Sequence, residues 1–351
     1  MNSTRDFPGR RNALKLISAA AVAGPFIHTS ARAADPLFIN TWGGDWDKAA
    51  NAHLFAPYTK ASGVEIRTVS PVSYAKLAAQ ARTGQYEFDV TTLGGSELIR
   101  AAEAGLIEPI DTSVVNMGAL SKDQVLLNGI ASHAFATVVA YRKDKYPNGG
   151  PQSWKDFWDT KKFPGPRSMQ RYAARVLPLA LLADGVPADK LYPLDLDRGF
   201  ASLDKIKKDI RVWWTQGQQS QQLLRDGEVD TIAIWTGRVV DLQRQNVPVE
   251  LVWNQAQIDR AYWVVAKGTP RAKQAWNFIN TALKAENLAP FCVQASLSPV
   301  NPAVFSQISK EDARLMPTNP ANYKTAVEQD FVKLGPQMAD LSRRFDQWVV
   351  R

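Results

Sequence analysis

The chain from residue 34 onward opens with a regular alternation of short apolar runs and amphipathic stretches. The apolar runs predict strands and the stretches after them predict helices, in the order 37–42, 45–60, 64–69, 74–82, 88–93 and 97–104. Ser73 is placed to cap the second of these helices, and Gly84 comes just after its end. Because strands and helices alternate, this order predicts a parallel sheet with right-handed crossover connections.

A second series of the same kind begins near residue 150. Ser153 and Asp156 form a capping box, and Pro178 should kink the apolar helix expected at 171–183. Further helices are predicted at 196–208 and 219–225, and further strands at 211–214, 229–235, 247–253 and 262–266. Thr269-Pro270 should begin another helix, and the chain from about 302 reads as mostly helical. The chain therefore contains a second α/β unit.

Residues 1–33 have the pattern of an export signal. Arg10 and Arg11 precede a short apolar stretch that ends near Ile27, and Ala31-Arg32-Ala33 offers a cleavage site. The apolar stretch is too short to span a membrane. The paired arginines resemble a twin-arginine signal. We therefore expect a cleaved leader and a periplasmic protein, with the twin-arginine route left open.

The charge of the chain depends on whether this leader is counted. The whole sequence of 351 residues carries a formal net charge of +8, whereas residues 34–351 keep 37 basic and 33 acidic residues, a net charge of +4. No run of five like charges remains, so nucleic acid is not expected as a partner. Cys292 is the single cysteine, which excludes a disulfide framework, and its apolar neighbours predict a buried thiol.

Motifs for catalysis are nearly absent from the sequence. Ser73 and Ser202 each begin an S-x-x-K pattern, but neither has the partner motifs that a hydrolase of that type requires. His53 and His133 have no metal-like partner at three or four residues. There is no Gly-rich phosphate loop either. We expect no catalytic residue, no metal and no cofactor, and a secreted α/β enzyme remains only as an alternative.

Features that suit binding are more numerous. Two predicted strands end in glycine pairs, one following Trp42 and one at Gly94-Gly95-Ser96, where the backbone can approach a ligand. Plain turn glycines would give the same pattern. Trp235 also stands at a strand end, ahead of Arg238. An aromatic wall there could hold an ammonium group or a flat ligand.

These features together resemble one family, the extracellular solute-binding proteins of ABC importers, and most closely its spermidine/putrescine-binding branch. The stretches that carry the resemblance are 196–208, 227–235, 263–272 and 298–301. The resemblance implies a two-lobed α/β periplasmic-binding-protein fold with a ligand cleft between mostly parallel sheets. It places the lobes at 34–138 plus 264–302 and at 139–263 plus 303–351, with chain crossings near 136–143 and 260–266.

The resemblance also implies a function, a partner and a set of site residues. Such a protein delivers a small solute to membrane permease subunits that a cytoplasmic ATPase drives, and we expect it to be a monomer; a sensor that presents its ligand to a membrane receptor remains an alternative. The implied ligand-binding residues are Trp42, Gly43, Gly94, Gly95 and Ser96 on one side, and Tyr172, Arg175, Trp235, Arg238, Arg260 and Tyr262 on the other.

The implied site departs from the polyamine branch in its charge. Polyamine binders use carboxylates because a buried ammonium without a counter-charge is costly. Tyr172 and Arg175 stand where acids are expected. A second expected acid falls on Ala261, beside Arg260, and Asp259 could replace it only if the alignment slips. Arginines that face the cleft would suit a carboxylate instead. The sequence therefore leaves two solute classes open, a carboxylate-bearing amino acid or organic acid, and a polyamine.

Overall fold

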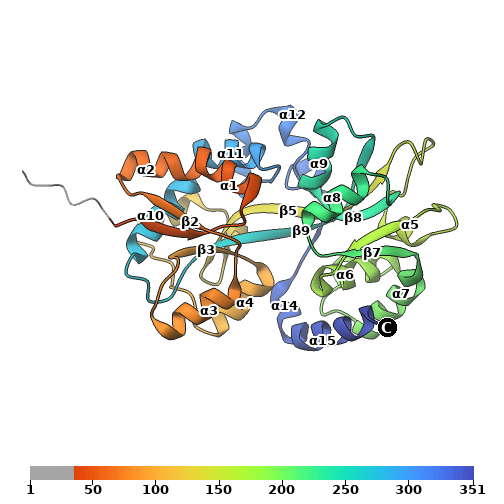
Figure 1. Ribbon diagram of the computed structural model, residues 1–351, viewed down its shortest axis with the longest axis horizontal. Helices are drawn as coiled ribbons and strands as arrows, with labels where there is room; N and C mark the ends of the chain where they lie inside the picture. Colours follow the sequence, from red (N-terminus) through yellow and green to blue (C-terminus); the bar gives the residue numbers. More distant parts are fainter. Residues whose placement is uncertain (1–34) are drawn as a thin grey trace, which may run out of the picture. The chain divides into compact units, whose positions relative to one another are not determined.

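The computed structural model describes residues 35–351, so the predicted export signal at 1–33 lies outside the described residues. A mixed sheet forms its framework, with the strand order β2-β1-β3-β9-β5-β8-β6-β7. β2, β1 and β3 at one end of this order belong to the first lobe, and β8, β6 and β7 at the other end belong to the second (Figure 1). The two central strands, β9 and β5, belong to both lobes. The predicted two-lobed α/β fold is confirmed.

The first lobe contains the first α/β series. β1 (Leu37–Asn40) pairs in parallel with β2 (Ile66–Val69) and β3 (Val90–Gly94), as the alternating pattern predicted. The helices between the strands were also predicted, and Ser73 caps one of them by accepting a hydrogen bond from the Lys76 amide at 3.2 Å. They are α1 (Gly44–Ala50), a π-helical turn (Asn51–Phe55), α2 (Ala56–Ser62), α3 (Tyr74–Thr83) and α4 (Gly95–Glu103).

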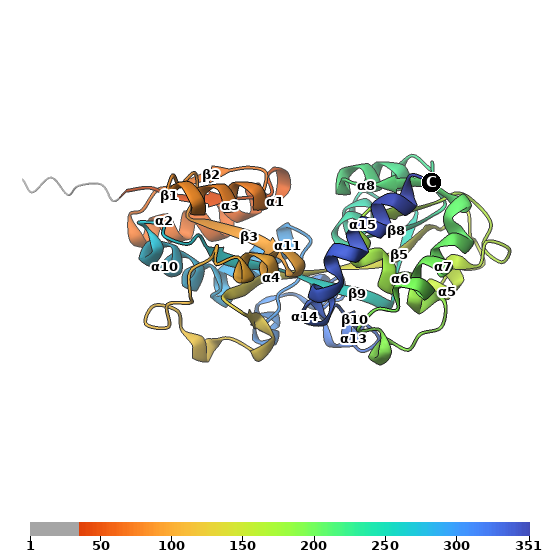
Figure 2. The ribbon, with the colours of Figure 1, turned by 90° about the horizontal axis from the view of Figure 1, so that it is seen from below.

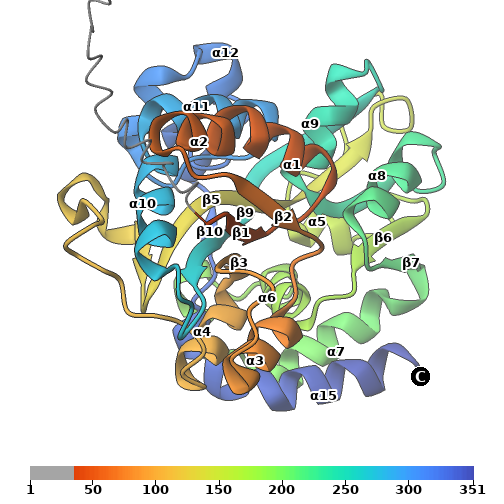
Figure 3. The ribbon, with the colours of Figure 1, turned by 60° about the vertical axis from the view of Figure 1, so that its left-hand side comes forward.

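Helices cover both faces of this first sheet. α1 and α2 lie on one face together with α10 (Ala272–Ala282) and α11 (Ala285–Gln294), while α3 and α4 lie on the other (Figure 1, Figure 3). α10 begins at Ala272 and not at Thr269-Pro270, because the residues before it form a turn around Gly268. Cys292 is buried in this lobe, as expected for a small apolar side chain.

The second lobe contains the second series. β6 (Arg167–Gln170) pairs in parallel with β7 (Ile210–Trp214) and with β8 (Thr231–Trp235). Its helices lie close to the predicted positions, except that no helix was predicted at α9, and Pro178 lies inside α6. They are α5 (Trp154–Trp158), α6 (Ala173–Ala183), α7 (Leu196–Ile206), α8 (Gly217–Arg225) and α9 (Thr236–Arg244).

Two long antiparallel strands, β5 (Gly129–Arg142) and β9 (Val249–Val265), cross from one lobe to the other (Figure 2). The sequence predicted two separate strands in place of β9 and no strand for β5, and both expectations were wrong. β9 stays continuous because its irregular part is held from outside: Gln255, with φ of 58°, accepts a hydrogen bond from the Trp154 indole at 2.9 Å. The predicted lobe boundaries remain a prediction.

The C-terminal segment runs along these crossing strands. After α12 (Lys310–Ala313) and α13 (Pro320–Tyr323), the short strand β10 (Val327–Glu328) pairs in parallel with β9. α14 (Phe331–Leu334) then packs against α4 of the first lobe, and α15 (Met338–Val349) packs against α6 of the second. A hairpin strand, β4 (Val125–Leu126), precedes β5. No helix in residues 35–351 is both long and apolar enough to cross a membrane.

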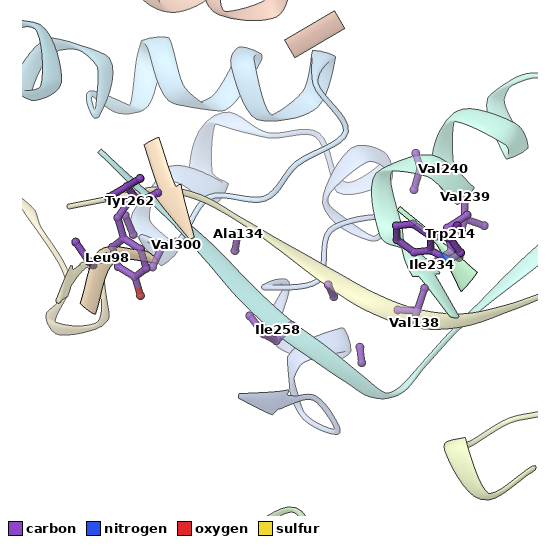
Figure 4. Packing of buried hydrophobic residues seen from close by; sticks show 14 of the residues in the cluster. Leu98, Ala134, Val138, Trp214, Ile234, Val239, Val240, Ile258, Tyr262 and Val300 are labelled. Atoms are coloured by element: carbon purple, nitrogen blue, oxygen red, sulfur yellow. The ribbon is translucent and has the colours of Figure 1, made fainter. Parts of the chain in front are cut away.

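The buried apolar residues follow this arrangement. One cluster fills the first lobe around Phe278 and Trp263, and a second fills the other lobe around Leu203 and Phe157. A third extends along β5 and β9, with Leu98 and Tyr262 at one end and Trp214 at the other, as Figure 4 shows. The crossing strands are therefore packed along their whole length, so they can hold side chains in fixed positions between the lobes.

Candidate functional site

The register of the crossing strands shows where the two lobes meet. β3 ends at Gly94, which is paired with Ala261 of β9, while β8 ends at Trp235, which is paired with Thr137 of β5. Ala261 is itself paired with His133 of β5. The two strand ends thus lie four residues apart along β5, roughly 13 Å at the usual rise of a strand. Ligands of open α/β sheets bind outside such carboxyl ends.

An arginine–carboxylate pair occupies the middle of this interval. Arg175, in the first turn of α6, donates from Nε to Oδ2 of Asp259 at 2.8 Å and from Nη2 to the same oxygen. The Asp259 side chain is 3% exposed and that of Arg175 is 20% exposed. Oδ1 of Asp259 accepts the amide of Arg260 at 2.8 Å. Both Asp259 oxygens are therefore used, and among the described residues nothing bonds Nη1 of Arg175.

Three aromatic rings surround the Arg175 guanidinium. Its central carbon lies 5.4 Å from the ring centroid of Tyr172, 5.5 Å from that of Phe135 and 5.8 Å from that of Trp235. Phe135 comes from β5, where it is the direct register partner of Asp259, so the two side chains share one face of the sheet. The rings attract the cation and restrict its orientation. We call Arg175, Asp259, Phe135, Tyr172 and Trp235 the arginine cluster.

The rings of the cluster are themselves fixed by their neighbours. Tyr172 stacks on Trp235 with an interplanar angle of 26°, and its hydroxyl donates to the Thr215 carbonyl at 2.5 Å. Trp214 meets Trp235 edge-on at 5.0 Å. Burial raises the pKa of Tyr172 above its ordinary value; the nearby positive charge of Arg175 lowers it and the negative charge of Glu97 raises it further. Glu97 belongs to α4, so the first lobe approaches the cluster at this point.

The predicted residues of the first lobe lie at the ends of β1 and β3. Trp42 follows β1 and is 46% exposed, while the amide of Gly43 donates to Asp47 at 3.0 Å. Gly43 has φ of 78°, a left-handed conformation that favours glycine. The amide of Gly94 donates to Glu97 at 3.1 Å. The turn at each strand end is thus stabilised by a carboxylate, with Trp42 exposed beside it.

Gly95 and Ser96 begin α4 near the same point, and the reason for the glycine is steric. A Cβ atom at Gly95 would lie 2.1 Å from the ring of Phe331, so only glycine allows this ring to pack here. Ser96 is half-buried. In the second lobe, Arg238 lies in the first turn of α9, close enough to Asp45 of α1 for its charge to help hold the pKa of that carboxyl low, after the larger effect of Lys48.

Arg260 and Tyr262 lie on the opposite face of β9 from Asp259, since successive side chains of a strand alternate. Arg260 forms a two-pronged ion pair with Glu328, including Nη2 to Oε1 at 2.9 Å, and Tyr323 donates to the same carboxylate. Burial lowers the pKa of Arg260, but the hydrogen bonds and charge of Glu328 outweigh this and raise it. Burial raises the pKa of Tyr262 to about 12. The structure does not bring these two residues together with Arg175.

His133 occupies the first-lobe end of the same sheet face as Phe135. Its ring packs against Trp46 and Phe291, and Nδ1 lies 2.9 Å from the Ser132 hydroxyl. Burial lowers the pKa of His133 to about 3. The imidazole is therefore neutral at ordinary pH and serves as a packed aromatic wall.

The sequence prediction missed Phe135, and it considered Asp259 only as a substitute acid. Phe135 lies on β5, for which no strand was predicted, so no pattern placed it near Arg175. The alternation of β9 could have separated Asp259 from Arg260, because neighbouring residues of a strand face opposite ways.

Other possible sites in the structure do not coincide with the arginine cluster. Residues 35–351 contain no group of three or more His, Cys, Asp or Glu side chains that could hold a metal ion. A cavity of about 310 Å³ is lined by residues of 188–192 and 326–333, among them Tyr192 and Asp330, and by no member of the cluster. The arginine cluster thus combines a partly exposed cation with aromatic rings, and it lies between the end of β3 in the first lobe and the end of β8 in the second.

Comparison with known proteins agrees with the two-lobed fold. Residues 53–318 match the model of the bacterial extracellular solute-binding protein family. The gamma-aminobutyric acid-binding protein of Pseudomonas aeruginosa is 32% identical over 322 residues, which cover 90% of this chain and 91% of the relative.

Two solved structures are similar over the same region. An ABC transporter substrate-binding protein from Bradyrhizobium japonicum has a TM-score of 0.85 and 33% identity, covering 90% of this chain and 99% of that one. A GABA receptor has a TM-score of 0.84 and 33% identity, covering 90% and 97%.

The fold and these similarities define a two-lobed binding protein and not an enzyme. The chain belongs to the bacterial extracellular solute-binding protein family. It is the substrate-binding component of an ABC transporter for small solutes, and proteins of this kind act outside the cytoplasmic membrane and interact with membrane permease components.

Proposed function

We propose that the solute is a small amino acid whose carboxylate binds Arg175, with γ-aminobutyric acid as the first candidate. The observation that carries this proposal is the geometry of the Arg175 guanidinium. Asp259 binds its Nε and Nη2 through one oxygen, so the Nη1 edge has no partner among the described residues and can receive a second carboxylate. The relatives named for γ-aminobutyric acid support this choice of solute.

The same geometry disfavours a polyamine, the other class that the sequence left open. An ammonium group placed at the cluster would meet the positive charge of Arg175. The carboxylates nearby can balance one ammonium group but not two: the charge of Asp259 is neutralised by Arg175, whereas Glu97 accepts the neutral Gly94 amide and keeps its charge. A second ammonium group would then remain without a counter-charge, which is costly in a closed site.

We propose that the solute lies between the lobes and contacts residues of both. On the second lobe it contacts Arg175, Tyr172 and Trp235, and Arg238 lines the edge of the site. On the first it contacts Trp42 and the strand ends at Gly43, Gly94, Gly95 and Ser96. Arg260 and Tyr262 are left out of the proposed contacts, because Glu328 binds both prongs of Arg260 on the other face of β9.

A thermal-shift and calorimetric series on the purified protein tests the solute class. γ-Aminobutyric acid, butyrate, butylamine and putrescine share a four-carbon chain and differ in their end groups. We expect γ-aminobutyric acid to raise the melting temperature most and to bind near 1 μM, about −8 kcal/mol. Butyrate should bind more weakly and putrescine should not bind. Stabilisation by putrescine alone would contradict the carboxylate proposal.

We also propose that residues 1–33 direct export by the twin-arginine route and that the lobe boundaries follow the predicted ranges, 34–138 plus 264–302 and 139–263 plus 303–351. Replacement of both Arg10 and Arg11 by lysine tests the route. The variant should accumulate in the cytoplasm, and unchanged export would reject the twin-arginine assignment.

A further inference from the structure

The helix that carries Arg175 contains Pro178 three residues later, and this proline leaves a specific carbonyl without its helical donor. In an α-helix the carbonyl of residue i accepts the amide of residue i+4. Proline has no amide hydrogen, so the carbonyl of Ala174 cannot receive that bond. This carbonyl directly precedes Arg175 in the chain.

A side chain from the C-terminal segment supplies the missing donor. Gln329, between β10 and α14, donates from Nε2 to the Ala174 carbonyl at 3.2 Å. Gln257 of β9 donates in the same way to the carbonyl of Arg175 itself, also at 3.2 Å. Gln329 is 8% exposed and Gln257 is 1% exposed. Two buried amides therefore hold the peptide units on either side of the Arg175 side chain.

Both amides are anchored in elements that do not belong to α6. Gln257 lies on β9 two residues before Asp259, so it is on the same sheet face as the carboxylate that Arg175 binds. Gln329 follows Glu328, which β10 and the ion pair with Arg260 attach to β9. The first turn of α6 is thereby fixed to the strand that carries Asp259, and the guanidinium keeps its orientation only while this turn stays in place.

We infer that Gln329 is a positioning residue for ligand binding, which acts through the main chain of α6 to hold Arg175 in its solute-binding orientation, and that Pro178 creates the acceptor it uses. This inference rests on the proposed role of Arg175. Gln329 itself need not touch the solute, because it acts through the Ala174 carbonyl.

The experiment is a double-mutant cycle with a matched control. Gln329→Met removes the donor at nearly constant length, and Pro178→Ala restores the helical amide that would replace it. Gln337→Met is the control, because Gln337 belongs to the same C-terminal segment and its half-buried side chain makes two hydrogen bonds, but to Leu194. Affinity for γ-aminobutyric acid is measured by calorimetry for each variant, with the melting temperature of the ligand-free protein beside it.

We expect Gln329→Met to weaken binding about fivefold, the range of one lost buried hydrogen bond. In the Pro178→Ala background the same substitution should change affinity by less than about twofold, since the helix then supplies its own donor. Gln337→Met should lower the melting temperature without weakening binding. Equal loss of affinity in Gln329→Met and Gln337→Met, or no rescue by Pro178→Ala, would overturn the inference.

A second readout separates this inference from the choice of solute. The Nε–H resonance of Arg175, identified by its loss in Arg175→Lys, reports the bond to Asp259 in the ligand-free protein. Gln329→Met should shift this resonance and speed its hydrogen exchange, and Pro178→Ala should restore both. If γ-aminobutyric acid does not bind the wild type but the resonance responds in this way, only the solute proposal fails. An unchanged resonance rejects the positioning role whether or not the solute binds.

Discussion

Two adjacent residues of β9 form arginine–carboxylate pairs of opposite character. On one face, Asp259 binds Arg175 through a single oxygen, three aromatic rings surround the guanidinium, and one edge of the arginine stays open. On the other face, Arg260 and Glu328 bind each other through both prongs, and Tyr323 adds a further bond to the carboxylate.

The difference shows how the same pair of chemical groups can serve binding or structure. A two-pronged pair satisfies the planar guanidinium and the carboxylate together, and it leaves little capacity for a third group. A pair held through one oxygen keeps the arginine fixed but incompletely satisfied. The carboxylate of Asp259 then orients the cation for a solute, whereas Glu328 joins β10 to β9.

The largest effect should come from Arg175→Met. Loss of a charge-assisted bond to the solute carboxylate should weaken γ-aminobutyric acid binding at least 100-fold, about 3 kcal/mol. The variant also leaves Asp259 buried without its partner, so stability should fall as well. The double variant Arg175→Met/Asp259→Asn should recover stability but not binding. Near-normal affinity of the double variant, measured by calorimetry, would remove Arg175 from the site.

Arg260→Met should lower the stability of the protein and leave its affinity for the solute nearly unchanged. It breaks a pair whose side chains are 14% and 38% exposed, so we expect a loss of about 1–2 kcal/mol in the free energy of unfolding, reduced from the buried-pair value by solvent screening. Affinity for the solute should stay within about threefold of the wild type. Urea unfolding and calorimetry measure the two quantities. A variant with unchanged stability and lost binding would return Arg260 to the site and end the contrast between the faces.

The loss of folding stability in acid should come from His133, and not from Arg175 or Arg260. The pKa of His133 is lowered to about 3 in the folded protein, so the unfolded chain binds the proton first as the pH falls below about 6.5. Protonation of this histidine in the unfolded chain should therefore lower the free energy of unfolding by about 2 kcal/mol between pH 7.5 and pH 5. His133→Asn should remove that slope in urea unfolding, while His53→Gln serves as the control and should retain it. A slope that persists in His133→Asn would assign the loss to other groups.

The smallest effect should follow Trp42→Ala. This side chain is 46% exposed, so its removal should leave the melting temperature unchanged. If the ring covers the bound solute, affinity should fall about fivefold, the scale of one aromatic contact. Trp213→Ala is a poor control because that ring packs against Phe345 and Trp348. Exposed Val350→Ala is suitable, and equal affinity of the two variants would exclude Trp42 from the contacts.

The sequence was sufficient for the local elements but not for the centre of the molecule. Side-chain periodicity and caps such as Ser73 and Ser153 are local, and the helices they predicted are present. The continuity of β9 depends on two hydrogen bonds of the irregular residue Gln255, whose carbonyl accepts from the Trp154 indole and whose amide donates to the Thr325 carbonyl. Trp154 lies about a hundred positions before Gln255 in the chain and Thr325 about seventy positions after it. No local sequence pattern reveals contacts over such separations.

The candidate site likewise contains residues that could be predicted from the sequence and residues that only long-range contacts reveal. Arg175, Tyr172 and Trp235 were all identified from the sequence, and the structure brings them into one cluster. Trp235 ends a predicted strand, whereas Tyr172 and Arg175, near the start of a predicted helix, were implied by the family resemblance. The sequence could not supply Phe135, since only the register of β5 against β9 places that ring opposite Asp259. It also grouped Arg260 with Arg175, although a single step along a strand reverses the direction of a side chain.

The ring of Phe331 over Gly95 has a consequence for how this chain can diverge. A Cβ at residue 95 would collide with that ring, which belongs to the segment that also carries Gln329. Positions 95 and 331 are therefore expected to covary among descendants of this sequence: an alanine or serine at 95 requires a smaller residue at 331. A library randomised at both positions and selected for export of folded protein should return such compensated pairs and few single replacements of the glycine.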